Sequence, residues 1–217
     1  MSRYIDIGVH AFPEGADTPL RLGLAAHKLG YHSVVITNHT PFTPLFCDDS
    51  VICGVEIKAQ NVAELKKRIA LYRRTATVLS VHGGSDKINR AACRDERVDV
   101  LMHPEHGRHN GLNQVTAKLA KQNGVAIGFS LSYFWNTNGT RRARLLAFQR
   151  KNIALCKKFG AKIVITSDAC SHYDLRAPRE LKALAKIASL NEDEAEAALS
   201  SVPFEIILRR NRQEGVA

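Results

Sequence analysis

The sequence predicts an α/β protein whose parallel strands form a TIM-barrel-like (β/α) barrel. Short runs rich in Val and Ile alternate with helical patterns almost to the end of the 217 residues. Buried strands joined by helices are typical of such barrels. No linker, repeat or low-complexity segment interrupts the pattern, so we expect one barrel domain over residues 1–208 and a C-terminal tail over residues 209–217. An open doubly wound sheet is the alternative, because periodicity does not separate the two folds.

The expected strands are short β-branched runs. They cover residues 4–9, 33–37, 51–57, 77–81, 98–102, 125–130, 162–166 and 204–208. The expected helices cover residues 18–29, 62–72, 88–94, 113–122, 141–159 and 178–188, followed by a short acidic helix over residues 192–199. Residues 41–50 show no helical pattern, so one barrel helix is expected to be missing or irregular. We expect Asn61 to cap a helix start with Glu64, and Gly30, Gly124 and Gly160 to end helices.

Polar side chains follow six of the expected strands. They are His10, Asn38 with His39, Glu56, His82, His103 and Asp168. The carboxyl ends of barrel strands meet at one mouth, so we expect these side chains to converge. Imidazole and carboxylate groups in such a cluster are ligands for zinc or manganese. The alternative is that each histidine is an isolated hydrogen-bonded residue.

These strand ends are similar to those of the polymerase-and-histidinol-phosphatase (PHP) class of metallophosphoesterases. The matching elements are Asp6 with His10, Thr37-Asn38-His39, Gly54 with Glu56, Val81-His82, His103-Pro104 and Ser167-Asp168. The resemblance implies a PHP-like barrel and, as an alternative function, a metal-dependent phosphoesterase with a degenerate metal site. Gly8, Asn38 and Cys170 stand where the PHP patterns have His, Asp and His. A multinuclear hydrolytic site is therefore expected to be broken, leaving a vestigial zinc or manganese site among the strand-end residues, or none.

Basic residues are concentrated in the second half of the chain. The whole chain has 31 Lys and Arg against 21 Asp and Glu, but residues 106–167 carry eleven basic residues and no acidic one. A surface without counter-charges attracts polyanions. The pattern favours a nucleic-acid partner over a merely basic surface.

The expected helix 141–159 has apolar side chains on about half of its circumference and basic side chains opposite. Arg141 and Arg142 lie at its start, where free backbone amides also favour anions. The other basic side chains are Arg144, Arg150, Lys151, Lys157 and Lys158. We expect this face to contact RNA without a neutralising acid, and the acidic helix 192–199 to face away from the RNA. The alternative is a solvated helix that happens to be basic.

Further candidates for RNA contact lie in loops or at helix starts near strand ends. They are Lys87, Asn89, Arg90, Arg108, Arg176 and Arg179. Arg binds phosphate in a fork and stacks on bases. A structural ion pair explains each single Arg equally well. The Gly83-Gly84 turn is explained by a tight barrel loop as well as by a phosphate cradle.

From residue 78 to residue 185 the chain resembles a second, more specific family, protein component 3 of ribonuclease P. The resemblance is carried by Val81-His82-Gly83-Gly84, Lys87-Ile88-Asn89-Arg90-Ala91-Ala92, Val98-Asp99-Val100-Leu101, His103-Pro104-Glu105, Gly111-Leu112-Asn113, Asn123-Gly124-Val125-Ala126-Ile127, Phe129-Ser130-Leu131, Arg142-Ala143-Arg144-Leu145-Leu146, Val164-Ile165-Thr166-Ser167 and Pro178-Arg179. The order of these segments is preserved over about half of the chain.

This resemblance implies an RNA-binding subunit of the ribonucleoprotein that removes 5′ leaders from precursor tRNA. In the family the RNA subunit cleaves with its own Mg²⁺, so the chain itself is expected to supply no catalytic residue and to need no cofactor. The implied partners are ribonuclease P RNA, protein component 2 and the other protein subunits, with precursor tRNA as the substrate of the complex. The chain resembles the archaeal type, because eukaryotic relatives usually carry an additional charged tail.

Cysteine usage and hydropathy bear on the compartment. The five cysteines contain no CxxC pair, and we expect them to be reduced thiols. No apolar stretch has the length that crosses a bilayer. The sequence therefore predicts a cytoplasmic protein without a membrane partner.

Overall fold

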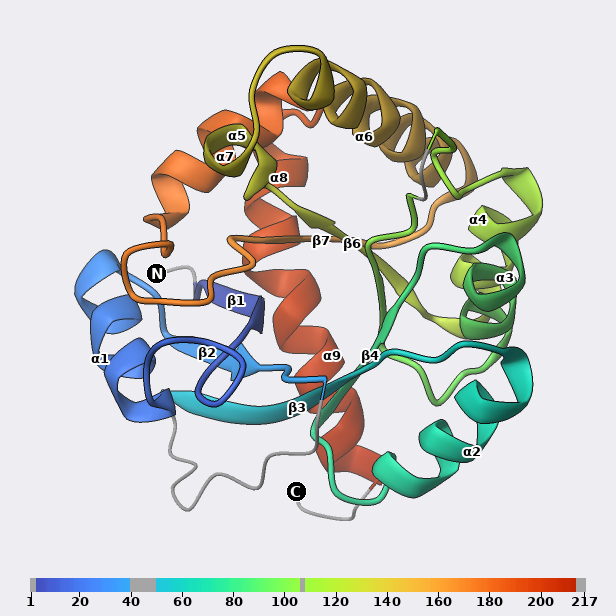
Figure 1. Cartoon of the computed structure of the whole chain (residues 1–217), viewed down its shortest axis with the longest axis horizontal. Coiled ribbons are helices and arrows are strands. Elements are labelled where there is room, and N and C mark those ends of the chain that lie inside the picture. The colour runs from blue at the N-terminus through green and yellow to red at the C-terminus, as the bar shows by residue number, and fades with distance from the viewer. Residues whose placement is uncertain (1–2, 40–49, 106–107, 214–217) are drawn as a thin grey trace.

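The computed structural model shows parallel strands in a nearly closed barrel with helices around it (Figure 1). It describes residues 3–39, 50–105 and 108–213, and of residues 210–213 only the backbone. In these ranges the strands are β1 (Ile5–Val9), β2 (Ser33–Ile36), β3 (Val51–Ile57), β4 (Val78–His82), β5 (Val100–Met102), β6 (Ala126–Ser130) and β7 (Ile163–Thr166). The helices are α1 (Pro19–Leu29), α2 (Val62–Tyr72), α3 (Asp86–Arg94), α4 (Gln114–Asn123), α5 (Tyr133–Asn136), α6 (Gly139–Phe159), α7 (Pro178–Ile187), α8 (Glu192–Leu199) and α9 (Ser201–Gln213).

The strand order confirms the predicted barrel. Each strand pairs in parallel with the next one along the chain, from β1 to β7, and β1 lies beside β7. The open doubly wound sheet is therefore not formed. Both faces of the strands are buried, which explains their continuous apolar runs. Val34, Leu79 and Ile127 belong to a cluster that includes the surrounding helices, whereas Ile5 and Val78 belong to the inner cluster.

Among the described residues, no backbone hydrogen-bond ladder joins β1 to β7. A side chain connects the two strands instead. The carboxylate of Asp6 accepts hydrogen bonds from the backbone N–H of Ser167 at 3.2 Å and from its Oγ at 2.5 Å. Farther along, the backbone N–H of His10 donates to the carbonyl of Ala169 at 2.8 Å. Burial raises the pKa of Asp6 to about 6, although the hydrogen bonds from Ser167 act in the opposite direction.

The predicted eighth strand, residues 204–208, is wrong, because this segment lies within α9. Figure 1 shows α9 in red, crossing one end of the barrel. Its Ile206 is buried in the inner cluster with Ile5, Val78 and Val100, the first residues of three strands. α9 therefore closes the amino-terminal end of the barrel, and burial of one helix face overrides the strand-like composition. The predicted boundary at residue 209 falls inside α9.

The predicted helix ends are confirmed. The side chain of Asn61 accepts a hydrogen bond from the backbone N–H of Glu64 at the start of α2. Gly30, Gly124 and Gly160 follow α1, α4 and α6 in the left-handed conformation that glycine adopts at low cost.

The expectation that the cysteines are reduced thiols is wrong for Cys53, which is disulfide-bonded. Cys93, Cys156 and Cys170 are free. The irregular segment expected over residues 41–50 lies, apart from its last residue, outside the described residues. Among the helices of the described ranges, none combines the length and the apolar character that a membrane crossing needs.

Candidate functional site

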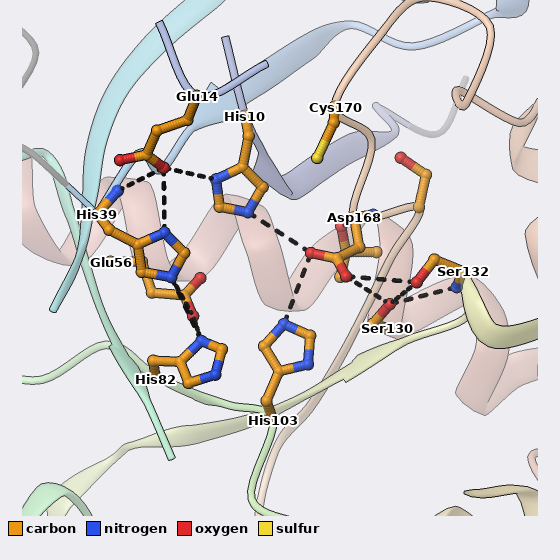
Figure 2. A network of polar contacts seen from close by, with 12 residues as sticks. His10, Glu14, His39, Glu56, His82, His103, Ser130, Ser132, Asp168 and Cys170 are labelled. Carbon is orange, nitrogen blue, oxygen red and sulfur yellow. Dashed lines mark hydrogen bonds and ion pairs between the residues drawn. The ribbon is translucent and has the colours of Figure 1, made fainter. Parts of the chain in front are cut away.

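The carboxyl ends of the strands form a polar mouth, which we call the barrel mouth (Figure 2). A cavity of about 490 Å³ is lined there by His10, Glu14, His39, His82, His103, Asp168 and Cys170. Glu56 lies fully buried beneath it and contacts His82. The predicted convergence of the strand-end residues is thus confirmed for all of them except Asn38. Their role as metal ligands is a separate matter and stays a prediction at this point.

Glu56, His39 and His82 form one half of the barrel mouth. The Oε1 atom of Glu56 lies 2.6 Å from Nδ1 of His82 and 3.6 Å from Nε2 of His39, and these two nitrogens are 3.3 Å apart. Burial opposes ionisation of Glu56, but the hydrogen bonds with both imidazoles lower its pKa to about 2. Glu56 is therefore a carboxylate aimed at two imidazole nitrogens.

Glu14 is a residue of the mouth that the sequence analysis missed. Its Oε2 accepts hydrogen bonds from the backbone N–H of His39 at 2.9 Å and from Nδ1 of His39 at 3.0 Å, and lies 3.6 Å from Nδ1 of His10. Glu14 lies in the loop after β1, five residues beyond Val9, the last residue of that strand. A search for acids in the loops that follow strands would have found it.

The other half of the barrel mouth is centred on Asp168. Its Oδ1 lies 3.5 Å from Nε2 of both His10 and His103, and its Oδ2 accepts hydrogen bonds from Oγ of Ser130 at 2.9 Å and of Ser132 at 3.3 Å. Burial opposes the charge of His103, but Asp168 raises the pKa of that imidazole to about 10. Burial also opposes ionisation of Asp168, and the neighbouring His103 nevertheless holds its pKa well below the ordinary value. The two charges stabilise each other.

Backbone strain accompanies this pair. His103 has φ 46° and Asp168 has φ 55°, in the left-handed region that residues with a side chain seldom adopt. Such strain persists where surrounding contacts fix it, and it is common at functional sites.

The three departures from the PHP patterns have local explanations. Gly8 has φ 113°, and an added Cβ would come within 3.0 Å of Oγ1 of Thr166. The amide of Asn38 holds the loop after β1 by accepting from the N–H of Ala11 at 2.9 Å and donating to its carbonyl at 2.8 Å. Cys170 lies exposed at the rim of the cavity. Two of the three positions therefore serve the backbone and supply no ligand to the barrel mouth.

The basic residues of α6 separate into two groups that the sequence analysis had joined. Arg144, Lys151 and Lys158 are exposed and spaced seven residues apart, so they lie along one line of the helix. Among the described residues none of the three has an ion-pair or hydrogen-bond partner. We call these three residues the α6 stripe. Arg141, at the start of α6, is exposed as well.

The second group of α6 cations is used inside the protein. Arg150 donates from Nε and Nη2 to the carbonyl of Ile187, at 3.0 and 2.8 Å. Lys157 pairs with Glu194 of the acidic helix α8 at 2.8 Å. The expectation that no acid neutralises the basic face of α6 is therefore wrong at Lys157. At the helix start, Arg142 donates to the carbonyl of Thr137 at 2.8 Å.

The α6 stripe continues onto α4, which packs beside α6. The ammonium groups of Lys118 and Lys158 lie 5.4 and 5.7 Å from the centre of the Phe159 ring, and the Lys121 stem approaches Gly160. Lys118 and Lys121 were not predicted. They belong to the same acid-free stretch, but their position beside α6 depends on helix packing.

The remaining predicted RNA contacts differ in accessibility. Asn89 is fully buried and its side chain donates to the carbonyls of Pro104 and Gly111, which is a structural role within the protein. Its Oδ1 accepts from the N–H of Gly84, which makes Gly83-Gly84 a tight barrel loop. Arg176 stacks at 4.5 Å over the Trp135 ring.

Lys87 and Arg90 are exposed beside a groove of about 760 Å³ between α2 and α3. Asp86, Asp95 and Glu96 line the same groove, so its charge is mixed. Arg108 and Arg179 are exposed. The roles of these four cations toward RNA stay predictions.

Fold and mouth together define a PHP-like (β/α) barrel. The histidinol phosphate phosphatase of Lactococcus lactis has a similar fold, with a TM-score of 0.53 over 96% of this chain and 94% of that chain, at 10% identity. The more specific match is to the family model described as RNase P subunit p30, which covers residues 3–214. The chain therefore belongs to the RNase P subunit p30 family, and the predicted resemblance is confirmed.

Two relatives support this assignment. Ribonuclease P protein component 3 of Methanosarcina mazei is 41% identical over 216 residues, covering 96% of this chain and 90% of the relative. A chain in the cryo-EM structure of archaeal ribonuclease P with mature tRNA superposes with a TM-score of 0.79 at 28% identity, over 96% of this chain and 91% of that chain. These findings support the ribonuclease P assignment over the phosphoesterase alternative.

Proposed function

We propose that this ribonuclease P protein subunit binds the RNA subunit through the α6 stripe and helps it to remove 5′ leaders from precursor tRNA. The partners are ribonuclease P RNA, protein component 2 and the other protein subunits, in a cytoplasmic ribonucleoprotein. The observation that carries the proposal is the line of exposed cations Arg144, Lys151 and Lys158, which have no ion-pair or hydrogen-bond partner within the described residues of a p30-family chain. Membership in the family supplies the identity of the polyanion.

The physical contribution is neutralisation of phosphate charge. The α6 stripe extends over about 21 Å, because fourteen residues of helix rise by about 1.5 Å each. A cation that contacts a phosphate releases condensed counterions, which favours binding at low salt. Cations held on a rigid helix let RNA segments approach each other with less repulsion, so the RNA folds at a lower concentration of Mg²⁺.

Cleavage itself stays with the RNA and its Mg²⁺ in this proposal. The chain supplies no residue to the scissile phosphate and needs no cofactor for this role. The barrel mouth lies on the strand ends, whereas the α6 stripe lies on an outer helix (Figure 1). The two surfaces are therefore separable by mutation.

Reconstitution tests the proposal. Ribonuclease P is assembled from the RNA and the other protein subunits with and without this chain, and leader cleavage is measured across Mg²⁺ concentrations. We expect omission to raise the Mg²⁺ concentration at half-maximal rate several-fold. An unchanged Mg²⁺ requirement and rate would show that the chain makes no such contribution.

A further inference from the structure

We propose that the barrel mouth binds one zinc-class divalent ion through Oε1 of Glu56, Nε2 of His39 and Nδ1 of His82. This inference goes beyond RNA binding and does not depend on it. Glu56 and His82 lie at the carboxyl ends of β3 and β4, and His39 follows β2; these three strands are neighbours in the barrel. Their donor atoms all lie within 4.8 Å of one another.

The spacing of the donor atoms suits a tetrahedral ion. Bonds of about 2.0–2.1 Å from zinc to nitrogen or oxygen place two ligand atoms about 3.3 Å apart. The three separations in the barrel mouth are 3.3, 3.6 and 2.6 Å. Two of them are already close to the required value, and the third lengthens when an ion replaces the proton between Glu56 and His82.

A second observation points to a ligand at this place. Oε2 of Glu56 is buried and has no hydrogen-bond partner among the described residues. An uncompensated buried carboxylate oxygen is costly. A cation bound at Glu56 would stabilise this oxygen, either by direct coordination or through the neighbouring charge.

Glu14 prepares His39 for coordination. It accepts a hydrogen bond from Nδ1 of His39 at 3.0 Å, which leaves Nε2 of a neutral imidazole as the nitrogen with a free lone pair. That nitrogen is the one directed at Glu56 and His82. A carboxylate that fixes the tautomer of a ligating histidine is a recurrent feature of zinc sites.

The chemistry of the donor set selects the ion. Two imidazole nitrogens and one carboxylate match zinc, whereas Mg²⁺ prefers six oxygens in octahedral geometry. His39 and His82 line the cavity of about 490 Å³, which would let water serve as a further ligand. The bound ion would join the ends of three neighbouring strands and so stabilise the barrel mouth.

Metal binding by the isolated chain tests the proposal. Protein stripped with a chelator is titrated with Zn²⁺ by calorimetry and with Co²⁺ by visible absorption, and its Tm is measured with and without Zn²⁺. We expect binding of one equivalent of Zn²⁺ and the intense visible bands of tetrahedral Co²⁺. The Tm should rise by several degrees, because the ion binds only the folded state. Absence of stoichiometric binding by the wild-type chain would overturn the inference without any variant.

Variants locate the ion. His39→Asn and His82→Asn remove ligands whose side chains are each 30% exposed, and each should weaken Zn²⁺ binding at least about 100-fold. Glu14→Ala should weaken it about 10- to 100-fold by releasing the tautomer of His39. Circular dichroism checks that each variant folds.

Two controls accompany these variants. His103→Asn alters the same cavity, but Nε2 of His103 is directed at Asp168, so one equivalent of Zn²⁺ should remain. The exposed His27 lies on α1, and His27→Gln reports adventitious surface binding. Equal loss in His103→Asn and His82→Asn, or unchanged affinity in both ligand variants, would contradict the proposed ligand set. RNA is absent throughout, so failure here leaves the proposed function untouched.

Discussion

The barrel mouth and the outer face of α6 are both rich in ionisable side chains. Within the part of the chain that the structure describes, the charges are paired in the barrel mouth and unpaired on that face of α6. In the barrel mouth, Asp168 and Glu56 each lie within 3.6 Å of two imidazoles. On α6, Arg144 and Lys151 extend into solvent with no charged partner among the described residues. Paired charge determines the local structure of the protein itself. Charge that the fold leaves uncompensated indicates a partner outside it.

The same contrast holds within α6. Arg150 and Lys157 have partners in the α7–α8 region, whereas Arg144, Lys151 and Lys158 do not. Both groups consist of Arg and Lys residues of the same helix. Only the packing of α6 against its neighbours distinguishes a structural cation from one available to RNA.

The largest effect is expected from reversing the α6 stripe. The triple variant Arg144→Glu, Lys151→Glu, Lys158→Glu should lose roughly 100-fold in affinity for ribonuclease P RNA at 0.15 M salt from three lost phosphate contacts, and more because carboxylates repel phosphate. The slope of log K against log salt should become shallower by about 2 to 3. Filter binding across salt concentrations measures both quantities.

A matched variant controls for net charge. Lys28→Glu, Lys58→Glu and Lys67→Glu change the same number of exposed cations on other elements. This control should retain most of the affinity and the salt slope of the wild-type chain. If both triple variants lose affinity equally, net charge and not the α6 stripe governs binding.

The second prediction concerns a buried cation whose charge is paired inside the protein. Arg73 is buried, pairs with Asp99 at 2.6 Å and donates to the carbonyl of Arg97 at 3.0 Å. Arg73→Met leaves a buried carboxylate without its counter-charge and should lower the free energy of unfolding by about 3 to 5 kcal/mol. Urea denaturation measures the loss. The folded fraction should bind RNA as the wild-type chain does. A loss of RNA affinity in the folded fraction would contradict the separation of cations into those paired inside the protein and those that contact RNA.

The third prediction contrasts two carboxyl groups, Asp6 within β1 and Asp168 after β7. Asp168 has a cationic neighbour and a lowered pKa, whereas the pKa of Asp6 is raised to about 6 from 3.8 by burial. The folded state therefore binds the Asp6 proton more tightly than the unfolded state, and this stabilisation is lost as pH rises from about 4 through about 6.

Asp6→Asn keeps hydrogen bonds with Ser167 and removes the titration. At pH 7 it should be about 1 to 3 kcal/mol more stable than the wild-type chain, with no difference at pH 4. Denaturation at both pH values checks this, and a variant destabilised at pH 7 would contradict it.

Much of the fold was predictable because strand and helix periods are local properties of sequence. Seven of the eight expected strands are present, and the helix 62–72 has the predicted bounds. The exception is the expected eighth strand, residues 204–208, which has β-branched residues. Its Ile206 packs against the first residues of β1, β4 and β5. Only the assembled barrel presents an open end for this segment to cover, so no local pattern could reveal it.

The candidate site was predictable where topology alone determines position. Parallel strands bring their carboxyl ends together, so His10, His82 and Asp168 meet without further information. Glu14 was missed because the path of the loop after β1 is set by contacts, including the Asn38 amide that holds Ala11. The division of the α6 cations also depends on where α7 and α8 pack, which a helical wheel does not contain.

The smallest expected effect gives the sharpest comparison, because it separates two arginines of one helix. Arg150 donates to the carbonyl of Ile187, the last residue of α7, so Arg150→Gln should lower the free energy of unfolding by no more than about 1 kcal/mol. Its RNA affinity should hardly change. Arg144→Gln should show the reverse, with unchanged stability and an RNA affinity lowered about fivefold, as expected for one phosphate contact. Thermal denaturation and filter binding on the same preparations measure both properties. A weaker RNA complex for Arg150→Gln than for Arg144→Gln would place the RNA on the α7–α8 side of α6 and reverse the assignment of the two groups.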